Sequence, residues 1–135
     1  MKSKQKFFIC NKCGNLIGMI KNTGVPTVCC GEPMAELVPN TIEASTEKHL
    51  PVVEACSDDC CITVKVGSAP HPMIEEHYIP FIYVETEKGG QRKALKPGEE
   101  PVVSFCLCDD KPIAVFAYCN LHGLWKTDIA DCCCK

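Results

Sequence analysis

The stretch Ile62-Thr63-Val64-Lys65-Val66 alternates apolar and polar side chains without interruption. This two-residue period is typical of a β-strand that buries one face and exposes the other. Further runs rich in β-branched and aromatic residues cover 78–85, 102–108 and 112–119. Turn-forming residues separate the runs, at 57–59, 89–90, 97–98 and 109–110. Short strands with regular turns and no helical periodicity predict a mainly β protein, with an antiparallel β-sandwich from about residue 50 onward.

The bulk properties of the chain exclude several classes of protein. Its 135 residues suffice for one ordinary domain, or for a small domain and a very small one. A net charge of −3 does not favour binding to nucleic acid or to an anionic membrane. No apolar run approaches the length of a membrane span, and residues 1–9 hold too short an apolar core for a signal peptide. We therefore expect a cytoplasmic protein that binds neither nucleic acid nor a membrane.

Thirteen cysteines are an extreme number for a chain of this length. Such density usually indicates a secreted scaffold held together by disulfides. Here, however, no export signal precedes the cysteines, and they occur in runs at 29–30, 60–61 and 132–134. Adjacent cysteines rarely bridge each other, because a disulfide joins Cα atoms that lie well apart on converging backbones. A reducing cytoplasm with metal-bound cysteines is therefore favoured over a disulfide scaffold.

The N-terminal segment 1–37 contains two cysteine-rich turns, Cys10-Asn11-Lys12-Cys13-Gly14 and Cys29-Cys30-Gly31. A segment this short, interrupted by glycines and prolines, cannot bury a self-sufficient core. Four thiolates on one metal ion would supply the missing stabilisation. We therefore predict a tetrahedral site for iron or zinc with the ligands Cys10, Cys13, Cys29 and Cys30. Two structural disulfides, or free thiols, are the alternatives.

All the histidines lie beside predicted turns, and a cysteine stands three residues before the last of them. The resulting candidate ligands are His49, His71, His77, Cys119 and His122. Neutral imidazole together with thiolate suits iron, copper or zinc rather than calcium or magnesium. A closed zinc site would use only four of these ligands, whereas all five would leave an octahedral metal one open position. Ferrous iron is the natural candidate, and copper is less favoured because the 119–122 loop has no methionine for an axial ligand.

Four stretches around these candidates carry a specific family resemblance. They read EKHLPV at 47–52, VGSAPHPM at 66–73, EHYI at 76–79 and YCNLHGLWK at 118–126. These stretches closely resemble desulfoferrodoxin, the two-iron class of superoxide reductase. The cysteine pattern of segment 1–37 resembles desulforedoxin, a small iron protein. The resemblance implies a small desulforedoxin-like domain followed by an immunoglobulin-like sandwich, usually as a homodimer.

The resemblance also implies a division of the chain and a role for each candidate residue. The parts would be an iron domain (1–37), a linker and entry loop (38–48), a catalytic sandwich (49–127) and a Cys-rich tail (128–135). The four histidines would be equatorial ligands of the catalytic iron, with Cys119 as the axial ligand. The four N-terminal cysteines would hold the other iron, which zinc could replace. Glu47 would take the sixth position in the oxidised protein, and Lys48 would lie beside the mouth of the site.

The implied activity is one-electron reduction of superoxide to hydrogen peroxide without release of oxygen. Electrons would come from a rubredoxin-like donor. The N-terminal domain would either relay electrons or only hold two subunits together as a dimer. A non-enzymatic electron carrier and a cysteine-rich metal-handling protein are the competing functions. An open coordination position favours the enzyme, because a carrier needs none.

The remaining cysteines have no place in either predicted site. We expect them to be small apolar residues in a reducing cell, although the run at 132–134 could bind a further metal or link subunits. They are Cys56, Cys60, Cys61, Cys106, Cys108, Cys132, Cys133 and Cys134.

Overall fold

The computed structural model describes residues 2–56 and 61–129. Its chain forms two compact units, one spanning Lys4–Val38 and the other comprising the residues up to Ser3 and the chain from Pro39 onward. The expected roles of Cys60 and of the 132–134 run fall outside the described residues. Among the described residues, no helix has the length and apolar character needed to cross a membrane.

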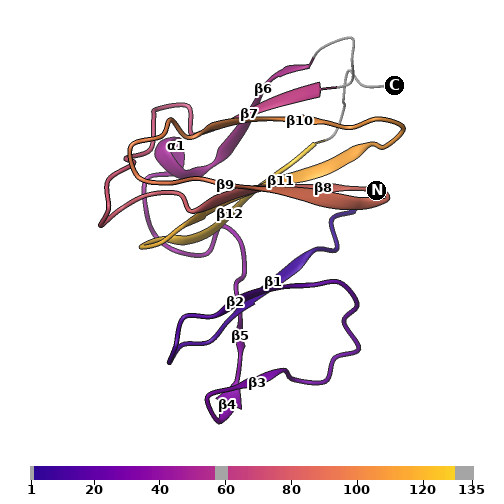
Figure 1. Ribbon diagram of the computed structural model, residues 1–135, viewed down its shortest axis with the longest axis vertical. Coiled ribbons are helices and arrows are strands. Elements are labelled where there is room, and N and C mark those ends of the chain that lie inside the picture. The colour runs from indigo at the N-terminus through magenta and orange to yellow at the C-terminus, as the bar shows by residue number, and fades with distance from the viewer. Residues whose placement is uncertain (1, 57–60, 130–135) are drawn as a thin grey trace. The chain divides into compact units, whose positions relative to one another are not determined.

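The small unit is a three-stranded antiparallel sheet with a separate hairpin. Its sheet has the order β2-β1-β5 and its hairpin joins β3 to β4 (Figure 1). The strands are β1 (Lys6–Ile9), β2 (Leu16–Met19), β3 (Val28–Cys29), β4 (Glu32–Pro33) and β5 (Ala35–Glu36). Among the unit's described residues only Phe7 and Cys10 are buried. So small a core cannot offset the entropy of ordering the chain, which agrees with the expected need for a metal.

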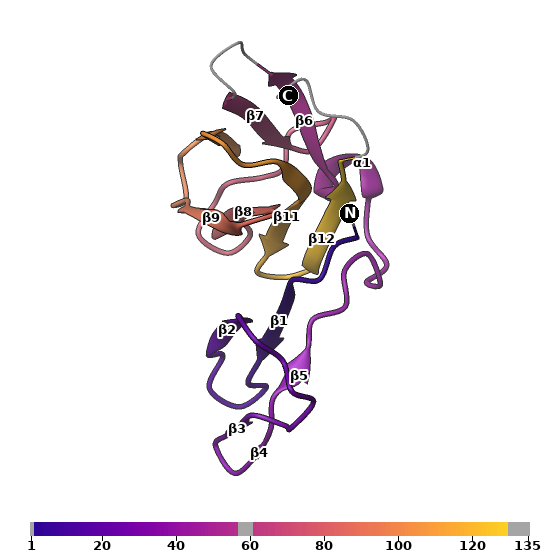
Figure 2. The same ribbon diagram turned by 90° about the vertical axis from the view of Figure 1, so that its right-hand side faces the viewer.

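The larger unit is a two-layered antiparallel sandwich, whose sheets appear in two orientations in Figures 1 and 2. One sheet has the order β10-β7-β6 and the other the order β12-β11-β8-β9. The first contains β6 (Pro51–Cys56), β7 (Cys61–Val66) and β10 (Val102–Cys106). The second contains β8 (Phe81–Thr86), β9 (Gly89–Ala94), β11 (Pro112–Cys119) and β12 (Gly123–Asp128).

The alternation at 62–66 determines which face of β7 is buried. Ile62, Val64 and Val66 are almost completely buried, whereas Thr63 and Lys65 between them are half-exposed. Phe105 of the neighbouring strand in the same sheet and apolar residues of the facing sheet complete the core, the latter including Ile82, Val84, Val115 and Ala117. The prediction of a mainly β protein, with a small four-cysteine sheet unit followed by an antiparallel sandwich, is confirmed.

One predicted turn and one predicted loop differ in the structure. Gly89-Gly90 is not a turn, because β9 already begins at Gly89 and the turn lies at 87–88. Gly90 is needed inside the strand, since the Tyr83 side chain fills the place where a Cβ would stand. The expected entry loop contains a one-turn helix, α1 (Thr46–His49).

The expectation that the surplus cysteines are apolar free thiols is wrong for Cys61 and Cys106. These two form a disulfide. Cys106 is exposed and Cys61 half-buried, because both occupy outward positions of their strands, opposite to the core residues Ile62 and Phe105. The two strands pair in register, which brings cysteines far apart in the sequence face to face.

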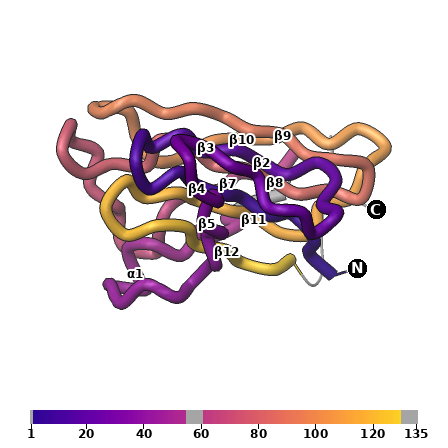
Figure 3. The backbone as a smooth tube through the Cα atoms, turned by 90° about the horizontal axis from the view of Figure 1, so that it is seen from below, coloured from indigo at the N-terminus to yellow at the C-terminus, as the bar shows by residue number. Residues whose placement is uncertain are grey.

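One end of the sandwich is formed by α1, the loop that follows β7 and the β11–β12 turn. The N–H of Ala69 and the hydroxyl of Ser68 both donate to the Glu47 carbonyl, at 2.9 and 3.2 Å. In Figures 1 and 3, α1 and the β11–β12 turn lie toward the same end of this unit. These contacts place the residues before β6 next to the loop that follows β7.

Candidate metal centres

The first cysteine turn of the small unit is closed by backbone hydrogen bonds. The Gly14 N–H donates to the Cys10 carbonyl at 2.9 Å, and the Cys13 N–H points at the Cys10 sulfur, 3.5 Å away. Gly14 has a φ of 83°, which glycine adopts without strain. The turn therefore presents the two thiols on one side and provides an amide donor to one of them.

The second cysteine turn explains how two adjacent cysteines reach one site. Cys29 pairs with Glu32 at the end of β3, so Cys30 and Gly31 form a two-residue hairpin turn. Both turn residues have positive φ, 52° for Cys30 and 79° for Gly31, as a type I′ turn requires. This backbone turns the Cys30 side chain back toward that of Cys29.

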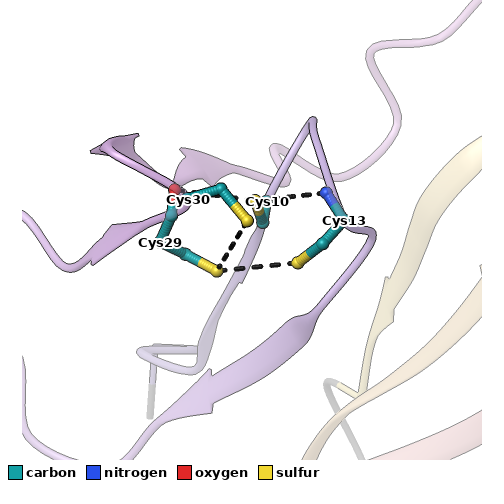
Figure 4. A group of neighbouring side chains, drawn as sticks. All are labelled: Cys10, Cys13, Cys29 and Cys30. Carbon is teal, nitrogen blue, oxygen red and sulfur yellow. Dashed lines mark hydrogen bonds between the residues drawn. The ribbon is translucent and has the colours of Figure 1, made fainter.

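The four sulfurs form one cluster, drawn in Figure 4. Sγ of Cys13 is 3.6 Å from Sγ of Cys29, which is 4.0 Å from Sγ of Cys30. Sulfurs bound to one tetrahedral ion at about 2.3 Å lie about 3.8 Å apart. The donor set and its spacing therefore fit a tetrathiolate metal site.

The acidities of these thiols indicate how the cluster behaves without a metal. The Cys13 N–H holds the pKa of Cys10 down, at about 6. Hydrogen bonding with the thiols of Cys13, Cys10 and Cys29 raises the pKa of Cys30 to about 12. At neutral pH the Cys10 sulfur therefore favours the thiolate and the Cys30 sulfur the thiol, and a metal ion bound by the cluster would displace the remaining protons.

The second cluster lies at one end of the sandwich and collects side chains from four segments. His49 ends α1, and His77 closes a bridge with Ile74 before β8. Cys119 is the last residue of β11, and His122 lies in the turn before β12. The ligand atoms of these four residues all lie within 4.8 Å of one another.

His71, the fifth predicted ligand, lies against this group but is not part of the closest set. Its ring centroid is 4.7 Å from that of His49 and 4.6 Å from that of His77. The structure thus shows a group of three histidines and one cysteine, with the fourth histidine in ring contact with two of them.

Hydrogen bonds orient two of the imidazoles toward the centre of the cluster. Nδ1 of His49 is 2.6 Å from the Ser45 carbonyl, and Nδ1 of His71 is 2.7 Å from the Pro72 carbonyl. Because a carbonyl only accepts, each Nδ1 carries the ring proton and each Nε2 keeps its lone pair. Metal-binding histidines usually show this arrangement.

The unpaired nitrogens fit a metal ion. Nε2 of His71 and Nε2 of His77 are buried without a hydrogen-bond partner among the described residues, which is unusual for buried polar atoms. Nε2 of His49 lies 3.1 Å from Nδ1 of His122. Two nitrogens bound at about 2.1 Å to one metal and at a right angle to each other lie about 3 Å apart.

Burial also keeps the nitrogen donors in the form that binds metal. Desolvation lowers the pKa of His71 to about 4 and lowers the pKa of His49 and of His77. These imidazoles are therefore neutral at neutral pH. Burial raises the pKa of the Cys119 thiol, although the N–H groups of Leu121 and His122 oppose the shift. A bound cation would stabilise the thiolate that burial disfavours.

Two residues that support the cluster were not predicted from the sequence. Asn120 accepts a hydrogen bond from the Tyr78 N–H (2.9 Å) and donates one to the Glu76 carbonyl (3.0 Å), so it holds the chain on both sides of His77. Trp125 is buried in the sandwich. It also stacks on His49 at 5.0 Å and donates to the His122 carbonyl. The position of Asn120 between two candidate ligands was the available signal.

Glu47 and Lys48 stand directly before His49 on α1, and their side chains are exposed. The backbone carbonyl of Glu47 is held by the 67–69 loop. A Cβ at Gly67 would lie 2.5 Å from that oxygen, so the loop can approach α1 only with glycine there.

Comparison with known proteins places these clusters in a family context. A family model described as desulfoferrodoxin matches residues 41–128. The desulfoferrodoxin of Syntrophotalea carbinolica is 41% identical over 128 residues, covering 95% of this chain and 99% of that protein. That of Nitratidesulfovibrio vulgaris is 39% identical, again covering 95% and 99%. The crystal structure of the superoxide reductase from Treponema pallidum superposes on this chain with a TM-score of 0.77 at 37% sequence identity. The match covers 93% of this chain and 100% of the Treponema chain.

Replacing Asn120 should weaken the histidine–cysteine cluster more than the fold. Asn120→Ala removes two side-chain hydrogen bonds, which should cost about 1–3 kcal/mol of unfolding free energy. Metal affinity should fall by about 10–100-fold, because the His77 segment loses its anchor. Competition with a chelator measures the affinity.

The control is Asn40→Gly, which removes two similar hydrogen bonds to Lys126 and suits the positive φ of 63° at residue 40. This control should lower stability but leave metal affinity unchanged. Equal metal affinities for the two variants would contradict the anchoring role of Asn120.

Gly67→Ala should displace α1. The added methyl would meet backbone atoms of Glu47 and Lys48, which cannot rotate away as a side chain could. We expect a loss of about 1–3 kcal/mol in unfolding free energy and weaker metal binding by the cluster that contains His49. Gly18→Ala, whose methyl would meet only side-chain atoms, is the control. Normal metal binding by Gly67→Ala would show that α1 does not depend on this close approach.

Proposed function

The chain belongs to the desulfoferrodoxin family, and on this premise we propose that it is a superoxide reductase. The reaction combines superoxide, one electron and two protons to give hydrogen peroxide, without releasing oxygen. The observation that carries the proposal is the buried cluster at the end of the sandwich, where neutral imidazole nitrogens lack partners beside a buried thiol. More distant relatives include the superoxide reductase of Pyrococcus horikoshii, which is 34% identical to this chain over 100 residues.

We assign the catalytic iron to five donor atoms of this cluster. Nε2 of His49, of His71 and of His77, Nδ1 of His122 and Sγ of Cys119 are the proposed ligands. His71 is included because its Nε2 is buried and unpaired while its ring touches two of the others. Ferrous iron bound here would supply the single electron that superoxide needs.

The charges of the ligands suit an anionic substrate. Neutral histidines and one thiolate would leave a ferrous ion with a net charge of about +1. The desolvated imidazoles resist protonation, so this balance holds down to mildly acidic pH. His49 and His71 are buried, whereas His77 and His122 are half-buried, so the cluster opens to solvent on the side of the latter two. Water on that side can deliver the two protons.

Lys48 and Glu47 have separate proposed roles on α1. The chain carries a net charge of −3, which repels superoxide, so a local positive charge near the opening is needed to attract it. Lys48 provides that charge without binding the metal. We assign the sixth ligand of the oxidised protein to the carboxylate of Glu47, a hard anion that prefers the higher metal charge.

The tetrathiolate cluster is proposed to hold the second iron, which zinc can replace. The need for this metal is first of all structural, because the unit has almost no buried core. An electron donor of the rubredoxin type and a homodimer complete the proposal. Exposed Ile20, Val25 and Val28 support the dimer, since the small unit leaves these apolar side chains in water. A reducing cytoplasm, which keeps the five cysteine ligands of the two sites as free thiols, is the proposed location.

Removing a thiolate from each site should separate their roles. Cys119→Ser should abolish nearly all superoxide reduction, because a serine hydroxyl does not supply the electron-rich sulfur ligand. Cys13→Ser should destabilise the small unit but leave substantial activity with an artificial reductant. Stopped-flow or pulse-radiolysis rates, with iron content per chain, measure both effects. If Cys13→Ser proved as inactive as Cys119→Ser while the sandwich still held iron, the catalytic assignment would be wrong.

Removing the charge of Lys48 should slow the encounter with superoxide. Lys48→Ala should lower the second-order rate constant by about tenfold, and the variant's rate should depend less on salt than the wild-type rate. Lys88→Ala is the control, because this lysine lies in the β8–β9 turn at the other end of β8. Pulse radiolysis at several ionic strengths gives the slopes. Equal slopes for wild type and Lys48→Ala would remove Lys48 from the mechanism.

A further inference from the structure

The Cys61–Cys106 disulfide lies at the opposite end of β7 from the histidine–cysteine cluster. Cys61 is the first residue of this strand, and Gly67 follows its last residue. The five residue steps along β7 correspond to about 17 Å. The disulfide therefore belongs to neither metal centre, and its chemistry needs a reactant that reaches it through solvent.

The bond joins two strands that do not depend on it. Cys61 and Cys106 are the last of five registered pairs between β7 and β10. On the same outer face, the preceding pair, Thr63 and Ser104, is joined by a hydroxyl–hydroxyl hydrogen bond at 3.1 Å. On the opposite face, Ile62 and Phe105 are completely buried in the core. Opening the disulfide would leave this pairing and packing in place, so the two sulfurs would stay opposite each other.

The two cysteine residues differ in their exposure to solvent. Cys106 is exposed, whereas Cys61 is half-buried. Cys108, two residues after Cys106, is also exposed and is a free thiol. Of the two residues, Cys106 is therefore the more accessible to a reactant from solvent, and Cys61 stands opposite it to complete an exchange.

We propose that Cys61 and Cys106 form a second redox site, a dithiol–disulfide pair that hydrogen peroxide oxidises and a dithiol protein reduces. The proposal rests on the proposed function for its oxidant, because superoxide reduction releases hydrogen peroxide at the other end of the same sandwich, and this neutral product reaches the disulfide by diffusion. Peroxide reduction by the pair would remove the product of the iron centre.

The chemistry balances with the reactants named. The Cys106 sulfur attacks one peroxide oxygen, the O–O bond breaks, and a sulfenic acid and one water form. The Cys61 thiol then attacks that sulfur, the S–S bond forms, and a second water leaves. The two sulfurs lose two electrons and the peroxide gains them. One thiol of a dithiol reductant attacks the Cys106 sulfur, and Cys61 leaves as a thiol. The second thiol of the reductant then attacks its own sulfur in this mixed disulfide, Cys106 leaves as a thiol, and the reductant ends as a disulfide.

The test uses iron-loaded protein reduced with dithiothreitol, freed of reductant without oxygen, and treated with one equivalent of hydrogen peroxide. Thiols are then alkylated, and the peptides are mapped by tandem mass spectrometry. Cys61 and Cys106 should be found joined, with Cys108 alkylated. In Cys61→Ser, a sulfenic-acid probe should label Cys106. Alkylated Cys61 and Cys106 after peroxide, or a bond that dithiothreitol opens only in denaturant, would overturn the proposal.

A steady-state measurement supplies matched controls. With excess dithiothreitol, wild type should consume peroxide over many turnovers, above the rate of dithiothreitol alone. Part of the peroxide consumption is due to the iron and should be the same in all variants. Cys106→Ser should lose the remaining, thiol-dependent part of the rate, whereas Cys108→Ser should keep it. Equal rates for Cys106→Ser and wild type would overturn the redox site. All three proteins should retain the iron spectrum, which shows that they fold.

The same assay separates failure of this site from failure of the proposed function. In Cys119→Ser, added peroxide should still close the bond, but a superoxide source should close it more slowly than in wild type. If peroxide formed the disulfide in both proteins, and a superoxide source formed it at the same rate in Cys119→Ser as in wild type, superoxide reduction would be refuted. The proposal of a thiol redox site would still hold.

Discussion

The antiparallel pairing of β11 with β8 on one side and β12 on the other is the interaction on which the functional end of the sandwich depends. Tyr118 pairs with Phe81 and Cys119 with Gly123. A shift of one residue in this register would turn every side chain of β11 to the opposite face. Cys119 would then turn away from the face that it shares with the core residues Val115 and Ala117, and the turn that carries His122 would move with it. The buried apolar residues of β11 prevent such a shift, so the core of the sandwich also determines the geometry of the ligands.

The two units combine metal binding and folding in opposite ways. In the sandwich, a large apolar core orders the chain, and the ligands occupy one end of a structure that is already stable. The small unit buries little besides Phe7 and Cys10, so a metal bound by its four cysteines would be part of what holds it together. This difference follows from size, because a short chain cannot remove enough apolar surface from water. Two metals in one chain can therefore have different physical importance.

Burial divides the cysteines of the described chain into different chemical classes. Cys10 and Cys119 are both buried beside other ligand atoms, and burial raises the pKa of the Cys119 thiol, so a cation would stabilise its thiolate. Cys61 on β7 and Cys106 on the edge strand β10 face outward from their sheet and form a disulfide with each other instead. A cysteine count alone cannot separate these classes, since the same side chain serves as ligand, redox group or small apolar residue according to its surroundings.

The sequence by itself determined the class of fold and which histidines and cysteines are candidate ligands. Strict alternation at 62–66, cysteines spaced for two turns, and histidines beside turns all depend on local periodicity and residue chemistry, which a sequence displays directly. The tertiary structure alone decided which nitrogen of each histidine is free, that Asn120 anchors the His77 segment, that Gly67 permits the approach of α1, and that Cys61 meets Cys106. Each of these depends on contacts between segments far apart in the chain. Local pattern does not encode strand register or the path of a loop, because both result from packing the whole core.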